Sequence, residues 1–147
     1  MGISLKTSRT DADRRIRQNR GFTLVELMVV VLIIVVLIGI SVPAYFIFRE
    51  RAREASTKSE MKSIVIAVEM YRNDYSVYPS PENFPHNIDN YFGGQAPEAD
   101  FWNTPYAYDS DGDTYLLRSN GRDRQEGTAA DIVFENGVMT STGAYGN

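Results

Sequence analysis

The feature that most limits the fold of this chain is a run of 22 residues without a charged side chain, from Leu27 to Phe48. At ~1.5 Å of rise per residue, the run makes a helix of about 33 Å, close to the thickness of the hydrocarbon core of a bilayer. The segment that follows, SVPAYFIFRERARE, holds large aromatic and charged side chains, not the small residues of a signal-peptide cleavage site. We therefore predict a spanning helix that is not removed at its far end.

Charge is distributed unevenly around this run. Residues 1–21 carry six Lys or Arg and two Asp, whereas residues 22–147 carry nine basic and 17 acidic side chains. A region this acidic lacks the basic surface that binds phosphates, so we expect no nucleic-acid partner. The basic residues before the run favour a cytoplasmic N-terminus, although five more follow it closely.

Two residues of this region are unexpected in a membrane helix. Glu26 lies directly before the run, where a carboxylate is costly, although the cost falls near the interface. Pro43 lies inside the run, where it removes a backbone hydrogen bond and kinks the helix. From composition alone, Glu26 is either an interfacial side chain that reaches the headgroups or a functional charge.

The stretch RGFTLVELMVVVLIIVVLIGISVP resembles the N-terminal processing and methylation segment of type IV pilins and type II secretion pseudopilins. The resemblance implies that a prepilin peptidase cuts between Gly21 and Phe22 and then methylates the new N-terminus of Phe22. Residues 1–21 would be a basic leader. Glu26 of one subunit would neutralise the Phe22 ammonium of its neighbour and so fix the stagger between them, since an unpaired buried charge is costly. Pro43 would belong to the same assembly helix.

Beyond the membrane run, the pattern predicts an amphipathic helix. Pro79 and Pro81 end it, so we expect one helix over 22–75, with 22–48 in the membrane and filament core and 49–75 continuing the shaft. At ~1.5 Å per residue its 54 residues span about 80 Å, which suits a shaft packed among copies of itself. The predicted apolar stripe recurs at mostly three- and four-residue spacing: Ala52, Ala55, Ser59, Ile64, Ala67, Val68, Tyr71 and Tyr75.

Residues 76–147 change to turns and short strands. The segment 76–105 is rich in Pro, Asn and Gly, which indicates a long loop with one helical turn, and His86 is expected at its surface. PYAYDS and DTYLLRS flank the turn DSDGD, and ADIVFENGVMTST holds a second turn at Asn136-Gly137. The predicted fold class is α+β: a long N-terminal helix packed against a small antiparallel β-sheet head of three or four strands, type IV pilin-like by the resemblance.

The head carries a second resemblance, to the C-terminal region of the major pseudopilin of type II secretion. It lies in DFWNTPYAY and TYLLRSNGRDRQEGTAADI. In that family the last loop binds calcium. Carried over to this chain, the ligands would be the carboxylates of Asp123 and Asp131 and a carbonyl of Asn120.

This loop departs from the family pattern at two positions. Arg124 stands where glycine is common, and Ala130 stands where a further carboxylate is frequent, with Glu126 as the available substitute. Because calcium takes six to eight oxygens, the alternatives are a calcium site and a glycine-rich loop held by hydrogen bonds alone. The acidic run from Asp109 to Asp113 does not match an EF-hand, whose twelfth position would fall on Asn120, and a hairpin turn explains it better.

No nucleophile–base pair, P-loop or metal triad occurs in the sequence, so we do not predict an enzyme. The first hypothesis is a subunit of a periplasmic pseudopilus that drives type II secretion, anchored once in the bacterial inner membrane with its N-terminus cytoplasmic and its head periplasmic. Its partners would be copies of itself in a helical filament, the prepilin peptidase, the inner-membrane assembly platform, minor pseudopilins and membrane lipid.

Two alternatives remain. The chain could be a major or minor type IV pilin of a surface pilus, serving adhesion, motility or DNA uptake; many such pilins close their C-terminal region with a disulfide, and this chain has no cysteine. It could also be a membrane-anchored binding module, which would need neither Gly21 nor Glu26.

Overall fold

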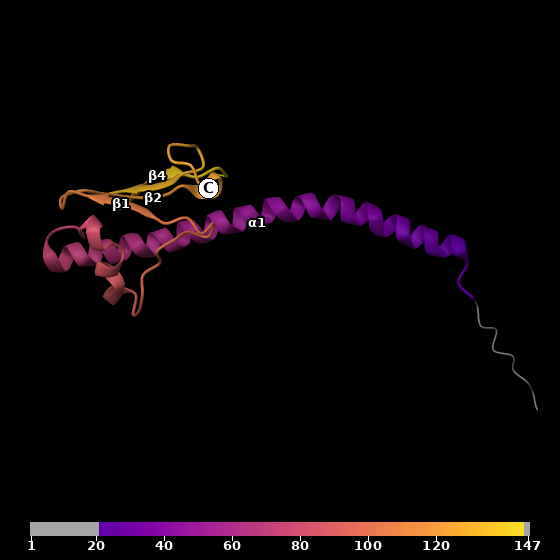
Figure 1. Ribbon diagram of the computed structural model, residues 1–147, viewed down its shortest axis with the longest axis horizontal. Helices are drawn as coiled ribbons and strands as arrows, with labels where there is room; N and C mark the ends of the chain where they lie inside the picture. Colours follow the sequence, from indigo (N-terminus) through magenta and orange to yellow (C-terminus); the bar gives the residue numbers. More distant parts are fainter. Residues whose placement is uncertain (1–20, 146–147) are drawn as a thin grey trace, which may run out of the picture. The chain divides into compact units, whose positions relative to one another are not determined.

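The computed structural model describes residues 21–145, and the predicted basic leader lies outside these residues except for Gly21. The chain divides into two compact units, Met1–Gly39 and Ile40–Asn147. Over the described residues the elements are one α-helix, α1 (Leu24–Tyr75), three short 3₁₀ helices, and a four-stranded antiparallel sheet (Figure 1). This arrangement confirms the predicted α+β, pilin-like fold class.

Helix α1 begins two residues later than predicted and ends at the predicted residue, Tyr75. At its end Ser76 adopts a left-handed conformation (φ 63°), and its N–H donates to the carbonyl of Arg72 at 2.7 Å. Among the described residues, α1 is long and apolar enough to cross a membrane by length and composition. Pro43 lies inside it and has no N–H, so the carbonyl of Gly39, four residues earlier, loses its helical partner at the boundary between the two units.

The sheet is a meander of four strands in sequence order: β1 (Ala107–Ser110), β2 (Tyr115–Ser119), β3 (Ile132–Glu135) and β4 (Val138–Thr142). Both predicted hairpins are present. Asn136 and Gly137 have positive φ angles of 49° and 82°, as a two-residue turn between twisted strands requires.

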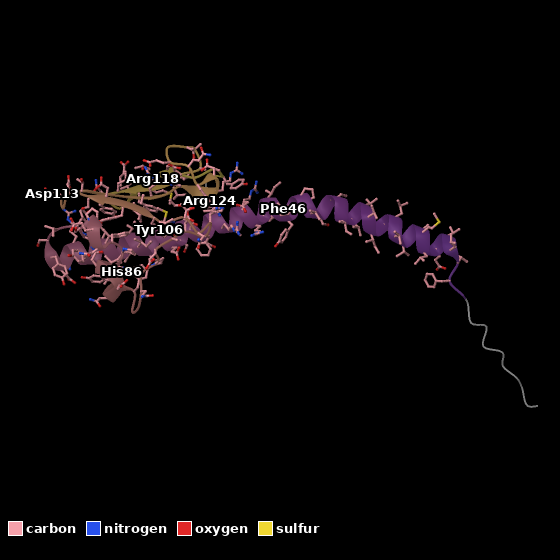
Figure 2. All side chains as sticks on the ribbon, viewed as in Figure 1. Phe46, His86, Tyr106, Asp113, Arg118 and Arg124 are labelled. Carbon is pink, nitrogen blue, oxygen red and sulfur yellow. The ribbon has the colours of Figure 1, made fainter. Side chains whose placement is uncertain are left out.

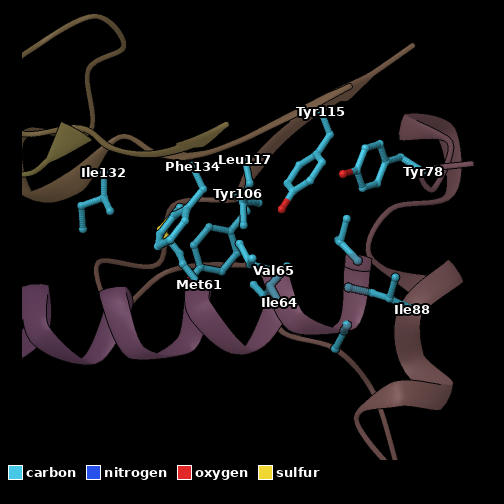
Figure 3. Close-up of a cluster of buried hydrophobic side chains, with 13 residues drawn as sticks. Met61, Ile64, Val65, Tyr78, Ile88, Tyr106, Tyr115, Leu117, Ile132 and Phe134 are labelled. Carbon is cyan, nitrogen blue, oxygen red and sulfur yellow. The ribbon is translucent and has the colours of Figure 1, made fainter. Parts of the chain in front are cut away.

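The core of the head forms between the second half of α1 and the inner face of the sheet (Figure 3). Side chains on β2 alternate between buried and partly exposed, so Tyr115, Leu117 and Ser119 point inward. Met61, Ile64 and Val68 of α1 are fully buried beneath the sheet. Burial of these large side chains stabilises a head that has no disulfide, since each contributes about 1.5–3 kcal/mol.

The predicted apolar stripe of α1 is wrong before Met61. Ala52, Ala55 and Ser59 are exposed, and so is Tyr75 at the other end, whereas Glu54 and Thr57 are buried. The reason is that loops rather than strands cover this part of the helix, and their backbone N–H groups need oxygen acceptors. Thr57 Oγ1 accepts the N–H of Phe101 at 3.4 Å, and Glu54 accepts the N–H of Tyr145 at 3.3 Å.

The segment between α1 and β1 is more ordered than the predicted single turn. It contains the 3₁₀ helices η1 (Pro81–Asn83) and η2 (His86–Tyr91). The ring of Phe84 stacks on Tyr108 of β1 with centroids 3.9 Å apart, which closes the end of the core. The His86 side chain is 58% exposed beside the carboxylates of Asp89 and Glu98, in agreement with its predicted surface position.

Candidate functional site

The expected cleavage junction is accessible. Gly21, Phe22 and Thr23 are exposed and precede α1 without regular secondary structure. A Cβ atom placed on Gly21 would meet nothing within 4 Å, so the fold itself does not require glycine there. An exposed chain without regular secondary structure and with no side chain at the cut is what a narrow protease cleft can accept.

Thr23 and Glu26 form the start of α1. The backbone N–H of Glu26 donates to Thr23 Oγ1 at 3.2 Å, and the N–H of Leu27 donates to the Thr23 carbonyl at 3.2 Å. Thr23 is therefore the N-cap, and Glu26 is the third helical residue, where a negative charge is favourable near the positive end of the helix dipole. Within residues 21–145 the Glu26 carboxylate has no hydrogen-bond or ion-pair partner. It is available to another molecule.

The outer surface of α1 before the head is uncovered. Every large apolar side chain from Leu24 to Phe48 is at least 43% exposed. Soluble monomers rarely expose contiguous apolar patches larger than a few hundred Å², so this surface needs lipid or other protein chains to cover it.

The loop between β2 and β3 is held by hydrogen bonds within it and by contacts to neighbouring segments. It contains the 3₁₀ helix η3 (Gly121–Asp123), after which Arg124 is left-handed (φ 58°) and donates to the carbonyl of Trp102 at 2.8 Å. Arg118 pairs with Glu126 at 2.8 Å, so the residue expected to supply an extra calcium ligand already has a cationic partner.

The three predicted calcium ligands differ in their surroundings. Asp131 is buried, and its two carboxylate oxygens accept the N–H of Gly127 at 2.8 Å and the hydroxyl of Thr128 at 3.3 Å. Asp123 is exposed and accepts the N–H of Gln125 at 3.1 Å. In the described chain, Asn120 Oδ1 is buried without a hydrogen-bond partner.

These residues fit calcium in the type of their atoms but not in number. All three offer oxygen, the ligand that calcium takes, and Asn120 offers one that is unsatisfied. Across residues 21–145, however, no group of three or more Asp, Glu, His or Cys side chains could hold a metal ion. The calcium site therefore stays a prediction. The hydrogen bonds of the loop match the alternative, a glycine-rich loop held by hydrogen bonds alone.

Sequence reasoning missed two groups. Thr23 as a helix cap could have been found from the pattern Thr-x-x-Glu at residues 23–26, which is typical of a helix start. Glu54, buried with Lys58 at 3.0 Å and with the N–H of Tyr145, had no such signal, because Tyr145 is 91 residues away.

Comparisons with known proteins agree with both resemblances. Residues 16–42 match the model of the prokaryotic N-terminal methylation motif, and residues 45–135 match the model of type II secretion system protein G. Type II secretion system core protein G of Pseudomonas aeruginosa is 32% identical, over 79% of this chain and 94% of the relative. The core protein G of Vibrio cholerae is 33% identical, over 81% and 93%.

The similarity to pilins is more limited. The type IV major pilin protein PilA of Myxococcus xanthus is 33% identical over 52% of this chain and 36% of its own length. No solved structure matches the chain. Because the protein G model covers more than half of the chain and the protein G relatives align over most of it, the chain belongs to the type II secretion system protein G family.

Proposed function

We propose that this chain is the structural subunit of a periplasmic pseudopilus of type II secretion. The observation that carries the proposal is the exposed Glu26 carboxylate, which starts an uncovered apolar helix and has no partner in the described part of the chain. Two environments can cover such a helix: lipid before assembly, and neighbouring helices afterwards. The protein G family match supports secretion as the process served.

Processing supplies the charge that Glu26 meets. Cleavage between Gly21 and Phe22 leaves an ammonium on Phe22, one residue before the helix cap. That ammonium lies near the positive end of the helix dipole, which opposes it. In a filament, Glu26 of the adjacent copy neutralises it, so one pairing per copy sets the axial stagger.

The membrane topology and partners follow from this assembly route. The N-terminus lies in the cytoplasm, the span crosses the inner membrane once, and the head lies in the periplasm. The prepilin peptidase processes the chain, and the assembly platform with minor pseudopilins starts the filament. In the head, Asn120, Asp123 and Asp131 would hold a calcium ion only with further oxygen ligands from backbone carbonyls or water, since calcium takes six to eight.

A pair of variants distinguishes a role of the Glu26 charge in assembly from a role in starting the helix of its own chain. Glu26→Gln keeps a residue suited to the third helical position but removes the charge. Thr23→Ala removes the cap, at about 1 kcal/mol, and keeps the charge. We expect Glu26→Gln to lower filament yield about tenfold or more and Thr23→Ala to assemble, with both still inserted in the membrane.

Mass spectrometry of the same material checks processing. The membrane form should start at Phe22 and be about 14 Da heavier than the unmodified chain, one methyl group. Normal filaments from Glu26→Gln, or residues 1–21 retained in filaments, would contradict the proposal.

Loss of function distinguishes secretion from the alternative of a type IV pilus, which the partial match to PilA supports. Cells without the chain should retain folded exoproteins in the periplasm and keep surface motility. Loss of motility with normal secretion would assign the chain to a pilus.

A further inference from the structure

A groove on the head is lined by positive charge. It has a volume of about 640 Å³ and lies along α1 from Arg51 to Lys62, with Tyr145 on its other side. Lys58 also lines it. We call it the basic groove.

The carboxylate in the basic groove does not cancel this charge. Glu54 is 3% exposed, pairs with Lys58 at 3.0 Å and accepts the N–H of Tyr145. The guanidinium of Arg51 lies 5.5 Å from the centre of the Tyr145 ring. Arg122 lies 5.4 Å from the same ring and donates to its hydroxyl at 3.0 Å.

Among the residues that the structure describes, three cations in and beside the groove have no carboxylate partner. In the part of the chain that the structure describes, Arg51, Lys62 and Arg122 form no ion pair. Their side chains are exposed, and the Tyr145 ring holds two of them in place. The exposed cations of the basic groove can therefore attract an acidic group.

The same head carries an acidic turn of opposite charge, residues 109–113, which comprises the end of β1 and the turn that follows it. Asp111 Oδ1 accepts the N–H groups of Asp113 at 3.0 Å and Thr114 at 2.7 Å, which fixes the turn. These hydrogen bonds, that from Thr114 first, lower the pKa of Asp111. Asp109 and Asp113 are exposed and form no ion pair among the described residues.

The basic groove and the acidic turn lie at opposite ends of the head. Tyr145 binds Glu54 near the start of the head's part of α1, whereas the carbonyl of Gly112 accepts the N–H of Tyr78 just beyond its end. Figure 2 shows Asp113 at that end. From Glu54 to Tyr75 the helix rises about 31 Å at ~1.5 Å per residue. A single head cannot bring the two surfaces together.

Complementary surfaces at opposite ends of one molecule join copies head to tail, which gives an open helical filament when the rotation between copies does not close a ring. We propose that, in the filament of the proposed function on which this inference rests, the acidic turn of one copy docks in the basic groove of another copy displaced along the axis by about the length of the head. Complementary charge then sets which heads meet and in which register.

Cross-linking in assembled filaments tests the contact directly. The chain has no cysteine. We would place one beside each charged surface, Ser59→Cys in the groove with Thr114→Cys after the turn, so that the charges are kept. The full processed chain is assembled and its filaments are treated with a bismaleimide. Because each copy joins two others, the expected product is a ladder from dimers to higher multimers. The matched control, Ser59→Cys with Glu82→Cys, moves the second thiol to an exposed residue of η1 and should give no ladder.

Charge reversal gives a second readout. Lys62→Glu should lower filament yield about tenfold or more, and adding Asp113→Lys in the same chain should restore it, whereas adding Glu82→Lys should not. Filaments that form from these variants with no ladder and no specific rescue would overturn the contact but leave the proposed function intact. Failure of the unaltered chain to form filaments would instead refute the proposed function.

An anionic membrane is the other surface that a basic groove fits. If Lys62→Glu leaves filament yield unchanged but weakens binding of the chain to phosphatidylglycerol vesicles, and the double-cysteine chain gives no ladder, the groove serves lipid and the proposed contact is wrong.

Discussion

Two left-handed glycines in the β2–β3 loop differ sharply in the space around them, and the effect of that difference on stability is measurable. Gly121 (φ 62°) and Gly127 (φ 81°) both adopt the left-handed conformation that side chains disfavour. A Cβ on Gly127 would meet nothing within 4 Å. A Cβ on Gly121 would overlap the carbonyl oxygen of Ala130 and lie 2.9 Å from its carbon. The backbone at Ala130 cannot easily move away from this Cβ, because the N–H groups of Ala130 and Asp131 both donate hydrogen bonds to Thr128.

The expected costs follow from these contacts. Gly127→Ala should lower the free energy of unfolding only by the cost of placing a side chain in the left-handed conformation, about 1–2 kcal/mol. Gly121→Ala should carry the same conformational cost and a further cost of about 1–3 kcal/mol from overpacking against Ala130, so the free energy of unfolding should fall by about 2–5 kcal/mol in all. For a domain of 60–100 residues, each 1 kcal/mol corresponds to about 4–8 °C in melting temperature. The two variants should therefore separate clearly.

The assay uses the single tryptophan of the chain. Trp102 is 4% exposed, and its carbonyl accepts the side chain of Arg124 from the loop in question. Urea unfolding of the processed chain in detergent micelles, followed by Trp102 fluorescence, gives the free energy of unfolding of the head. The slope with urea should be unchanged in both variants. Equal midpoints for Gly121→Ala and Gly127→Ala would show that residue 121 does not approach Ala130 as described.

Three other predictions concern the head. If the β2–β3 loop binds calcium, a hundredfold excess of calcium over Kd should stabilise the head by about 2.7 kcal/mol and raise its melting temperature relative to chelator. Asp123→Ala should abolish the difference. Equal melting temperatures with and without calcium would favour the loop held by hydrogen bonds alone. Burial, and next the hydrogen bond to Glu60, raises the pKa of Tyr106 above its ordinary 10.0. The contribution of the neutral Tyr106 to stability is therefore complete below pH about 10 and is lost as the pH rises further. Tyr106→Phe should reduce that alkaline loss in a pH series of melting curves. Leu117→Ala should cost about 2–5 kcal/mol in urea unfolding, since the side chain is fully buried, and a cost near zero would contradict the core described.

Local chemistry made much of the fold predictable. The turn at Asn136-Gly137 needs positive φ at both residues, and this pair adopts it at little cost. The end of α1 at Tyr75 follows from the prolines after it, since Pro79 could not continue the helix. In each case the residues that decide the structure are neighbours in the sequence.

The buried face of α1 was not predictable, because its partners are distant. Thr57 meets an N–H group 44 residues away and Glu54 one 91 residues away. A periodicity argument assigns polar residues to solvent, and here loop backbone takes the place of solvent. The side-chain hydrogen bonds of Asp131 are local, to Gly127 and Thr128. A carboxylate oxygen that accepts such bonds can equally bind a metal, so the sequence alone could not decide between a metal ligand and an internal acceptor.

The pattern at residues 23–26 combines a local and an intermolecular role in one short segment. Thr23 and Glu26 start the helix within one chain, as their hydrogen bond shows. Because that bond uses the backbone N–H of Glu26, its carboxylate remains exposed. Each processed copy would then bring one ammonium and one carboxylate into the filament core. The balance is per copy, so removing the carboxylate leaves one uncompensated charge in every repeat, where burial makes such charges costly. The penalty of Glu26→Gln therefore grows with filament length, whereas that of Thr23→Ala stays within each chain.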